Sequence, residues 1–317
     1  MSRAKRAVIA AAALLLLPIL VGAAWLTWQT RHGPDYVLQG ALPRVATEQV
    51  DNYGGKGCQP NATCRDVIIE TEAGPPLRFA FSLPEAAGDE KIPTVILLGG
   101  LRTGRESMKH VPDLGRNAIV TYEYPIDTQR WKRGSLFDRA SLGHDAVFAV
   151  PGQLATLIQW ARAQPWSDPE RISLVGVSLG ALVLPAGHRL AALQGQAPKA
   201  SILAYGGAGL GEILAANIKL QSDWLRTSLG WLFGRALRPI EPAAHVPHLD
   251  GAFLVINGAY DEMIPQSAAE ALHRITPEPK EIVVLPYDHI DPKDQHVVLE
   301  VLRVTRGWLA RQGAINP

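Results

Sequence analysis

The segment Arg171–Leu190 reads RISLVGVSLGALVLPAGHRL, and its centre, Gly176–Gly180, has the pattern Gly-x-Ser-x-Gly. A short run of apolar, partly β-branched residues precedes Ser178 and predicts a strand covered on both faces. The residues that follow favour a helix, which tolerates Pro185 near its first turns. Glycines on either side let the strand and the helix crowd together while the serine adopts strained backbone angles. The segment therefore predicts a sharp turn that presents Ser178 as a nucleophile; the alternative is an ordinary turn in which the serine caps the helix.

Composition and length exclude few classes of protein, but they limit the number of domains. The 317 residues carry a formal net charge of +1, and 47% of them are hydrophobic. A balance this close to neutral gives no electrostatic indication of nucleic-acid binding. The basic cluster Arg130–Arg133 is local and typical of a solvated loop; the alternative is contact with an anion or a lipid headgroup. The length fits one large domain or two small ones.

The N-terminus carries the pattern of a membrane segment. Basic residues at positions 3, 5 and 6 precede an uncharged run from Ala7 to Trp28. These roughly 22 residues would span about 33 Å as a helix, enough for a hydrocarbon core of about 30 Å. Trp25 and Trp28 lie where interfacial aromatic residues are expected.

Because basic residues stay in the cytoplasm, residues 1–28 predict a single-pass anchor with the remaining chain outside the cytoplasm, in the periplasm if the source is bacterial. One alternative is a cleaved signal peptide, with Gly22-Ala23-Ala24 as the cleavage site, which would give a secreted protein. A buried core helix is the third possibility.

Residues 29–65 are rich in Gly, Pro and polar residues with weak periodicity, and we interpret them as a linker and an irregular lead-in. Cys58 and Cys64 enclose a short polar loop within this segment. In an oxidising compartment they are expected to form a disulfide; the alternative is a pair of free thiols. No further cysteine or nearby histidine completes a metal site, so we expect no metal.

From Asp66 to the C-terminus, short apolar runs alternate with helical patterns. This rhythm predicts one α/β domain over residues 66–317, with a mostly parallel sheet and helices on both faces. The stretch 209–248 breaks the rhythm, and we interpret it as a helical cap over the carboxyl edge of the sheet; a pair of packing helices without a substrate role is the alternative. The strands are expected at 66–71, 77–82, 94–98, 118–123, 172–177, 200–205, 252–257 and 281–285, and helices at 142–163, 266–275 and 294–311.

Two further residues complete a nucleophilic constellation with Ser178. Asp261 follows the predicted strand 252–257, and His289 follows the strand 281–285. The order serine, acid, histidine is the one that this topology requires, and each residue would lie at a carboxyl strand end, where open α/β sheets place their sites. A base to take the serine proton and a carboxylate to orient that base are what hydrolysis through serine needs. The alternatives are Glu262 or Asp288 as the acid and His296 as the base.

An oxyanion intermediate also needs backbone donors. One N–H group is expected from Leu179, directly after the serine. The second is expected from Leu101, in the loop after the predicted strand 94–98, with Gly100 or Arg102 as alternatives. Glycines at 99 and 100 let the backbone approach a ligand closely.

The motifs GVSLG, NGAYDEMIP, LPYDHI and PTVILLGG resemble the α/β-hydrolase superfamily from about Asp66 to the C-terminus. They are most similar to the dienelactone-hydrolase and prolyl-oligopeptidase-like serine hydrolases. The resemblance implies a Ser178–Asp261–His289 triad and no cofactor. Many relatives have His-Gly at the oxyanion strand end, whereas this chain has Leu98-Gly99-Gly100.

The sequence as a whole predicts an exported serine hydrolase that cleaves a small-molecule or acyl ester through an acyl-enzyme, held at the membrane by residues 7–28. A serine peptidase or an acyltransferase would use the same triad. A binding protein with this fold and no catalysis is the alternative from a different class.

Overall fold

The computed structural model describes residues 31–39, 42, 45–59, 61–72, 74–85, 90–100, 103–111 and 115–317. The predictions for the segment 7–28 and for Leu101 and Arg102 concern residues outside these ranges. Among the described residues, no helix combines the length and the apolar character that crossing a bilayer requires.

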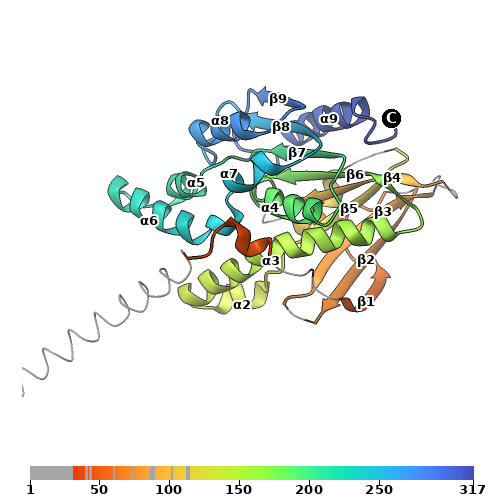
Figure 1. Cartoon of the computed structure of the whole chain (residues 1–317), viewed down its shortest axis with the longest axis horizontal. Helices are drawn as coiled ribbons and strands as arrows, with labels where there is room; N and C mark the ends of the chain where they lie inside the picture. Colours follow the sequence, from red (N-terminus) through yellow and green to blue (C-terminus); the bar gives the residue numbers. More distant parts are fainter. Residues whose placement is uncertain are drawn as a thin grey trace, which may run out of the picture.

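A single sheet organises the described chain (Figure 1). It has nine strands in the order β1-β2-β3-β5-β4-β6-β7-β8-β9. The pairs β1–β2, β2–β3 and β3–β5 are antiparallel, and every pair from β5–β4 to β8–β9 is parallel. The predicted mostly parallel sheet is therefore confirmed. The strands are β1 (Val45–Asn52), β2 (Ala62–Thr71), β3 (Leu77–Pro84), β4 (Ile92–Leu98), β5 (Ala118–Glu123), β6 (Ser167–Val177), β7 (Ala200–Ala204), β8 (Ala252–Gly258) and β9 (Lys280–Leu285).

Strand β1 corrects the prediction that residues 29–65 are only a linker and lead-in. It pairs with β2, which itself begins at Ala62 rather than at Asp66. All eight residues of β1 are exposed, so the strand has no buried face and shows no alternation of apolar and polar residues. The predicted disulfide between Cys58 and Cys64 is present, and it closes the turn between the two strands.

Helices cover both faces of the sheet. Long helices lie at each predicted position, and α3 begins at Leu136, earlier than expected, because the Ser135 side chain caps it in a capping box with Asp138. The α-helices are α2 (Thr128–Arg133), α3 (Leu136–Ala163), α4 (Leu179–Leu193), α5 (Leu210–Asn217), α6 (Asp223–Ala236), α7 (Pro242–His245), α8 (Gln266–Ile275) and α9 (Gln295–Arg311). The 3-10 helices are η1 (Pro34–Val37), η3 (Gly104–His110), η4 (Arg238–Ile240) and η5 (Val246–His248).

The hydrophobic core has two layers, one on each side of the sheet. Apolar side chains of α3, α4 and α8 pack against one face, as with Leu154, Leu184 and Leu272. The other face is covered by α9, which buries Val301 and Trp308 there. Because both layers exclude water, the buried parts of the central strands are mostly apolar, as in the second half of β6, Ile172–Val177.

The predicted cap region, residues 209–248, contains α5, α6, η4, α7 and η5. It is inserted between β7 and β8, so it begins at the carboxyl end of a parallel strand. Helices α5 and α6 pack against each other, and α6 lies at the periphery of the molecule (Figure 1).

Candidate active site

Ser178 occupies the junction between β6 and α4. Its backbone has φ 55° and ψ −116°, a conformation with positive φ that residues other than glycine rarely adopt. Its N–H donates to the carbonyl of Ala204 at the end of the neighbouring strand β7, at 2.8 Å. The strained turn lifts the serine out of the sheet and is held there by that bond.

Two glycines make this turn possible. A Cβ atom on Gly180 would collide with the carbonyl oxygen of Leu98 in β4, and one on Gly176 would lie 2.7 Å from the carbonyl carbon of Gly180. Strand and helix therefore approach more closely than any side chain would allow. The pattern Gly-x-Ser-x-Gly is here a steric requirement of the junction.

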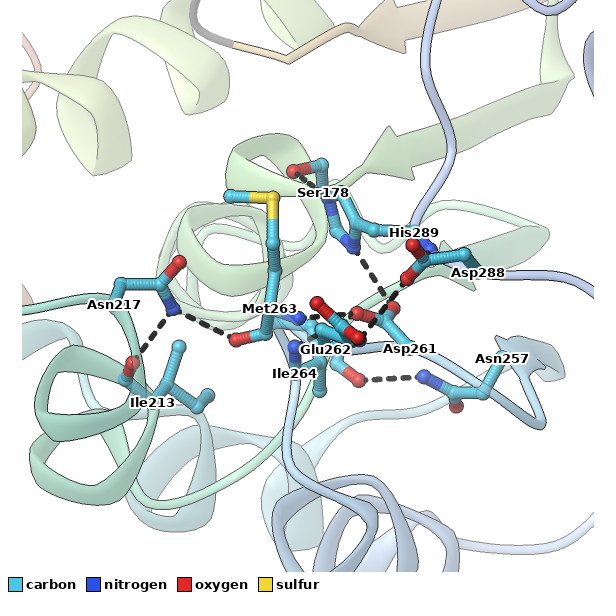
Figure 2. A network of polar contacts seen from close by, with 11 residues as sticks. Ser178, Ile213, Asn217, Asn257, Asp261, Glu262, Met263, Ile264, Asp288 and His289 are labelled. Atoms are coloured by element: carbon cyan, nitrogen blue, oxygen red, sulfur yellow. Dashed lines mark hydrogen bonds and ion pairs between the residues drawn. The ribbon is translucent and has the colours of Figure 1, made fainter. Parts of the chain in front are cut away.

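The structure brings Ser178, His289 and Asp261 together in one line of hydrogen bonds (Figure 2). Ser178 Oγ lies 2.8 Å from His289 Nε2, and His289 Nδ1 lies 2.8 Å from Asp261 Oδ2. The serine follows β6, the aspartate follows β8 and the histidine follows β9. Since an ionised carboxylate only accepts, Nδ1 carries the proton and Nε2 is left to accept the serine proton.

Asp261 is held by its own loop. Its second oxygen, Oδ1, accepts the backbone N–H groups of Met263 and Ile264 at 2.9 and 2.8 Å. The Asp261 side chain is 3% exposed and that of His289 is 10% exposed. A buried pair of this kind is screened little by solvent, so the imidazole is firmly oriented.

The alternative acids and base make other contacts. Asp288 Oδ1 accepts the backbone N–H groups of Glu262 and His289, which ties the Asp261 loop to the His289 loop. These two donors hold the pKa of the Asp288 carboxyl below its usual value. His296 Nε2 lies 2.9 Å from the Tyr287 hydroxyl instead of near the serine.

The candidate oxyanion site lies at the start of α4. The Leu179 N–H belongs to the first turn of the helix, where backbone donors have no acceptor within the helix, and the positive end of the helix dipole lies there. Gly100 approaches closely, because a Cβ atom on it would be 3.9 Å from Ser178 Cβ. Leu101 is outside the described residues.

Tyr124 supports this loop and was not found from the sequence. Its buried hydroxyl donates to the carbonyl of Gly99 at 2.7 Å, which orients the peptide that carries the Gly100 N–H. Thr103 donates its N–H and its hydroxyl to the carbonyl of Gly100. The sequence offers no local signal for either contact.

Tyr205 is a second residue that sequence reasoning missed. It directly follows β7 with φ 54°, and its ring packs edge-on against the His289 imidazole with centroids 5.6 Å apart. Burial, with a smaller contribution from Asp261, raises the pKa of Tyr205 to about 12, so the phenol is neutral. Its hydroxyl is buried and has no hydrogen-bond partner in the described part of the chain.

Helix α5 of the predicted cap borders the site. Asn217 Nδ2 donates to the carbonyl of Met263 and to that of Ile213, each at 2.8 Å. The half-exposed Met263 side chain extends toward Ser178 (Figure 2). The cap therefore contacts the loop that carries Asp261.

A polar pocket of about 450 Å³ opens beside His289, lined by Tyr287, Asp288, His289, Asp291, Lys293, Asp294 and Val297. Ser178 does not line it. Within the described ranges, no group of three His, Cys, Asp or Glu side chains has an arrangement that could hold a metal ion.

The arrangement of strands recurs in solved structures. Acetyl xylan esterase 1 from Thermoanaerobacterium superposes with a TM-score of 0.62 at 14% identity, over 89% of this chain and 93% of that chain. A protein assigned as a dienelactone hydrolase from Klebsiella pneumoniae gives 0.52 at 18% identity, over 78% and 98%. The acylaminoacyl peptidase of Pyrococcus horikoshii gives 0.54 at 16% identity, over 80% of this chain and 42% of that chain. The chain has the α/β-hydrolase fold. The predicted mostly parallel sheet with helices on both faces is thereby confirmed, whereas the predicted N-terminal helix lies outside the described residues. No protein-family model and no curated protein matches the sequence.

Proposed function

We propose that this protein is a serine hydrolase that cleaves carboxylic esters, with Ser178 as nucleophile, His289 as general base and Asp261 as the orienting acid. One observation carries the proposal. Two hydrogen bonds of 2.8 Å join the three side chains in series, and the serine stands on a strained turn at the start of a helix. A serine that only capped the helix would need neither these hydrogen bonds nor the strained turn.

In the proposed reaction, Ser178 Oγ attacks the acyl carbon of the ester while its proton passes to His289 Nε2. The negative oxygen of the tetrahedral intermediate accepts the Leu179 N–H and a second donor from the loop after β4. The intermediate collapses, and the alcohol leaves with the proton from His289. Water then attacks the acyl-enzyme, with His289 again taking the proton, and releases the acid. Asp261 stabilises the imidazolium formed in each half-reaction.

The solved structures favour an ester over a peptide substrate. The acetyl xylan esterase superposes with a TM-score of 0.62 and the acylaminoacyl peptidase with 0.54. We therefore place an ester first and a peptide second.

We further propose that the domain works outside the cytoplasm, anchored by residues 7–28. The basic residues before this run and the Cys58–Cys64 disulfide support export, because disulfides persist in oxidising compartments. A chain released by cleavage after residues 22–24 would be exported as well.

The test is hydrolysis of p-nitrophenyl esters of increasing acyl length by the full chain in detergent. We expect Ser178→Ala and His289→Ala to lower kcat by at least about 10³-fold, since each removes a group that the transition state requires. His296→Ala, a histidine variant in the first turn of α9, is expected to keep the wild-type rate.

A fluorophosphonate that labels serine nucleophiles provides a second readout. A folded wild-type chain that neither hydrolyses any ester nor takes the label would favour a non-catalytic binding protein. Hydrolysis that survives in Ser178→Ala would reject the triad.

A further inference from the structure

The outer face of α6 carries large apolar side chains that no described residue covers. Trp224 is 73% exposed and Trp231 is 61% exposed, and their spacing of seven positions places both on one side of the helix. Arg235 lies over the Trp231 ring at 5.1 Å, so a cation accompanies the aromatic pair. Two exposed tryptophans on one helix face are unusual for a surface that meets only water.

The described chain begins beside this helix. Its first element, η1, contacts η4, the turn that directly follows α6, and also contacts α3. The Tyr36 ring packs against Phe148 of α3, with centroids 6.2 Å apart. In Figure 1 the red N-terminal segment lies between α6 and α2.

Helix α2 contributes positive charge on the other side of η1. Its residues Arg130, Lys132 and Arg133 are all exposed. None of the three forms an ion pair with another described side chain. A basic helix and an aromatic helix thus flank the point at which residue 31 enters the fold.

We propose that the outer face of α6 and the basic side chains of α2 rest on a lipid bilayer with anionic headgroups. The bilayer is the one that residues 7–28 enter, so the proposal depends on the proposed anchor. Arg31 follows Trp28 by three positions, which limits their distance to about 10 Å even when the chain is fully extended. The surface around η1 must then lie close to the headgroups. Tryptophan and arginine are the residues that settle at this interface, and clustered Lys and Arg are drawn to anionic lipids.

This orientation has a consequence for the substrate. Helix α6 packs on α5, and α5 contacts the Asp261 loop through Asn217. The proposed ester site would therefore face the same bilayer, which suits an ester whose acyl chain is held in lipid.

The experiment uses the full chain in vesicles of phosphatidylglycerol and phosphatidylcholine. Both native cysteines are in the disulfide, so a single introduced cysteine can carry an environment-sensitive fluorophore. Trp231→Cys reports on α6. Leu299→Cys, an exposed apolar position on α9 across the sheet, is the matched control. A spin-labelled lipid is expected to quench the fluorophore at 231 at least about twofold more than at 299. Arg130→Glu combined with Arg133→Glu should reduce that difference, as should high salt.

Each contrary outcome has a distinct meaning. Equal quenching at both positions overturns the bilayer contact. Shielding at 231 that depends on protein density instead of lipid quencher would assign the face to a second copy of the chain. Shielding without either dependence would assign it to the chain's own N-terminal segment. A chain that stays in solution overturns the anchor as well, whereas ester hydrolysis by the same samples tests the catalytic proposal separately.

Discussion

Two residues other than glycine have a positive φ in the described chain, and both lie at the site. Ser178 has φ 55° and Tyr205 has φ 54°, and they directly follow the neighbouring strands β6 and β7. Such conformations cost on the order of 1–3 kcal/mol and persist where the surrounding structure holds them. The Ser178 N–H bonds to Ala204, the residue before Tyr205, so the two strained turns are coupled through one hydrogen bond.

Tyr205 can be tested through its ring and its hydroxyl separately. Tyr205→Phe keeps the ring against His289 and removes a buried hydroxyl that has no partner in the described structure. We therefore expect kcat/KM to change by less than about threefold. The free energy of unfolding should stay equal or rise by up to about 1 kcal/mol. Tyr205→Leu removes the ring, and the loosened imidazole should lower kcat by about tenfold or more. Ester hydrolysis and urea unfolding of both variants provide the measurements. If Tyr205→Phe loses as much activity as Tyr205→Leu, the hydroxyl itself takes part in the reaction.

At the scale of elements, the contact of β6 and α4 with β4 decides where the nucleophile lies. Gly180→Ala would drive a methyl group into the carbonyl oxygen of Leu98, so the helix would have to move away from the sheet and take Ser178 with it. We expect a loss of about 10²-fold or more in kcat/KM and a lower free energy of unfolding by roughly 1–3 kcal/mol.

Gly307→Ala on α9 is the matched control for that substitution. Its new methyl group would have Arg311 Nη1, at 3.8 Å, as its nearest neighbour, so it meets no backbone. Alanine in a helix interior should raise the free energy of unfolding by about 0.5–1 kcal/mol and leave hydrolysis unchanged. Denaturant unfolding of both variants checks the pair. Equal effects at the two positions would contradict the steric explanation of the elbow.

At the scale of the whole molecule, a histidine buried in the core makes the free energy of unfolding depend on pH. His188 of α4 is fully buried, stacks on Phe253 of β8 and lies 3.1 Å from the Ser201 hydroxyl. Burial lowers the pKa of His188 to about 4 from an ordinary value of 6.5. Between these values the unfolded chain binds a proton that the folded chain does not, so stability falls as the pH drops from 6.5 to 4. The wild type should lose on the order of 3 kcal/mol over that range through this residue.

His188→Gln isolates the contribution, because glutamine keeps a polar group near Ser201 but does not titrate. Urea unfolding at pH 7.5 and pH 4.5 should show a smaller acid loss in the variant than in the wild type. The same loss in both proteins would show that other groups account for the acid sensitivity.

The sequence by itself determined the central strands, the helices on both sides and the order of the three site residues. It could do so because strands buried on both faces are continuous apolar runs, as in β6 and β8, and the loops that follow them can be read directly. Strand β1 could not be found in this way, because every one of its residues is exposed and only its pairing with β2 makes it a strand.

The tertiary structure alone decided which groups meet. The sequence predicts Asp261 as the acid, with Glu262 and Asp288 as alternatives, but only the folded chain shows which carboxylate contacts His289 Nδ1. Tyr205 and Tyr124 give no local signal at all. The contact of η1 with η4, the turn that follows α6, is of the same kind. The periodicity of apolar residues in the sequence indicates which face of a single helix or strand is buried. A hydrogen bond between residues 28 or 111 positions apart depends on how the sheet stacks those elements, to within a fraction of an ångström.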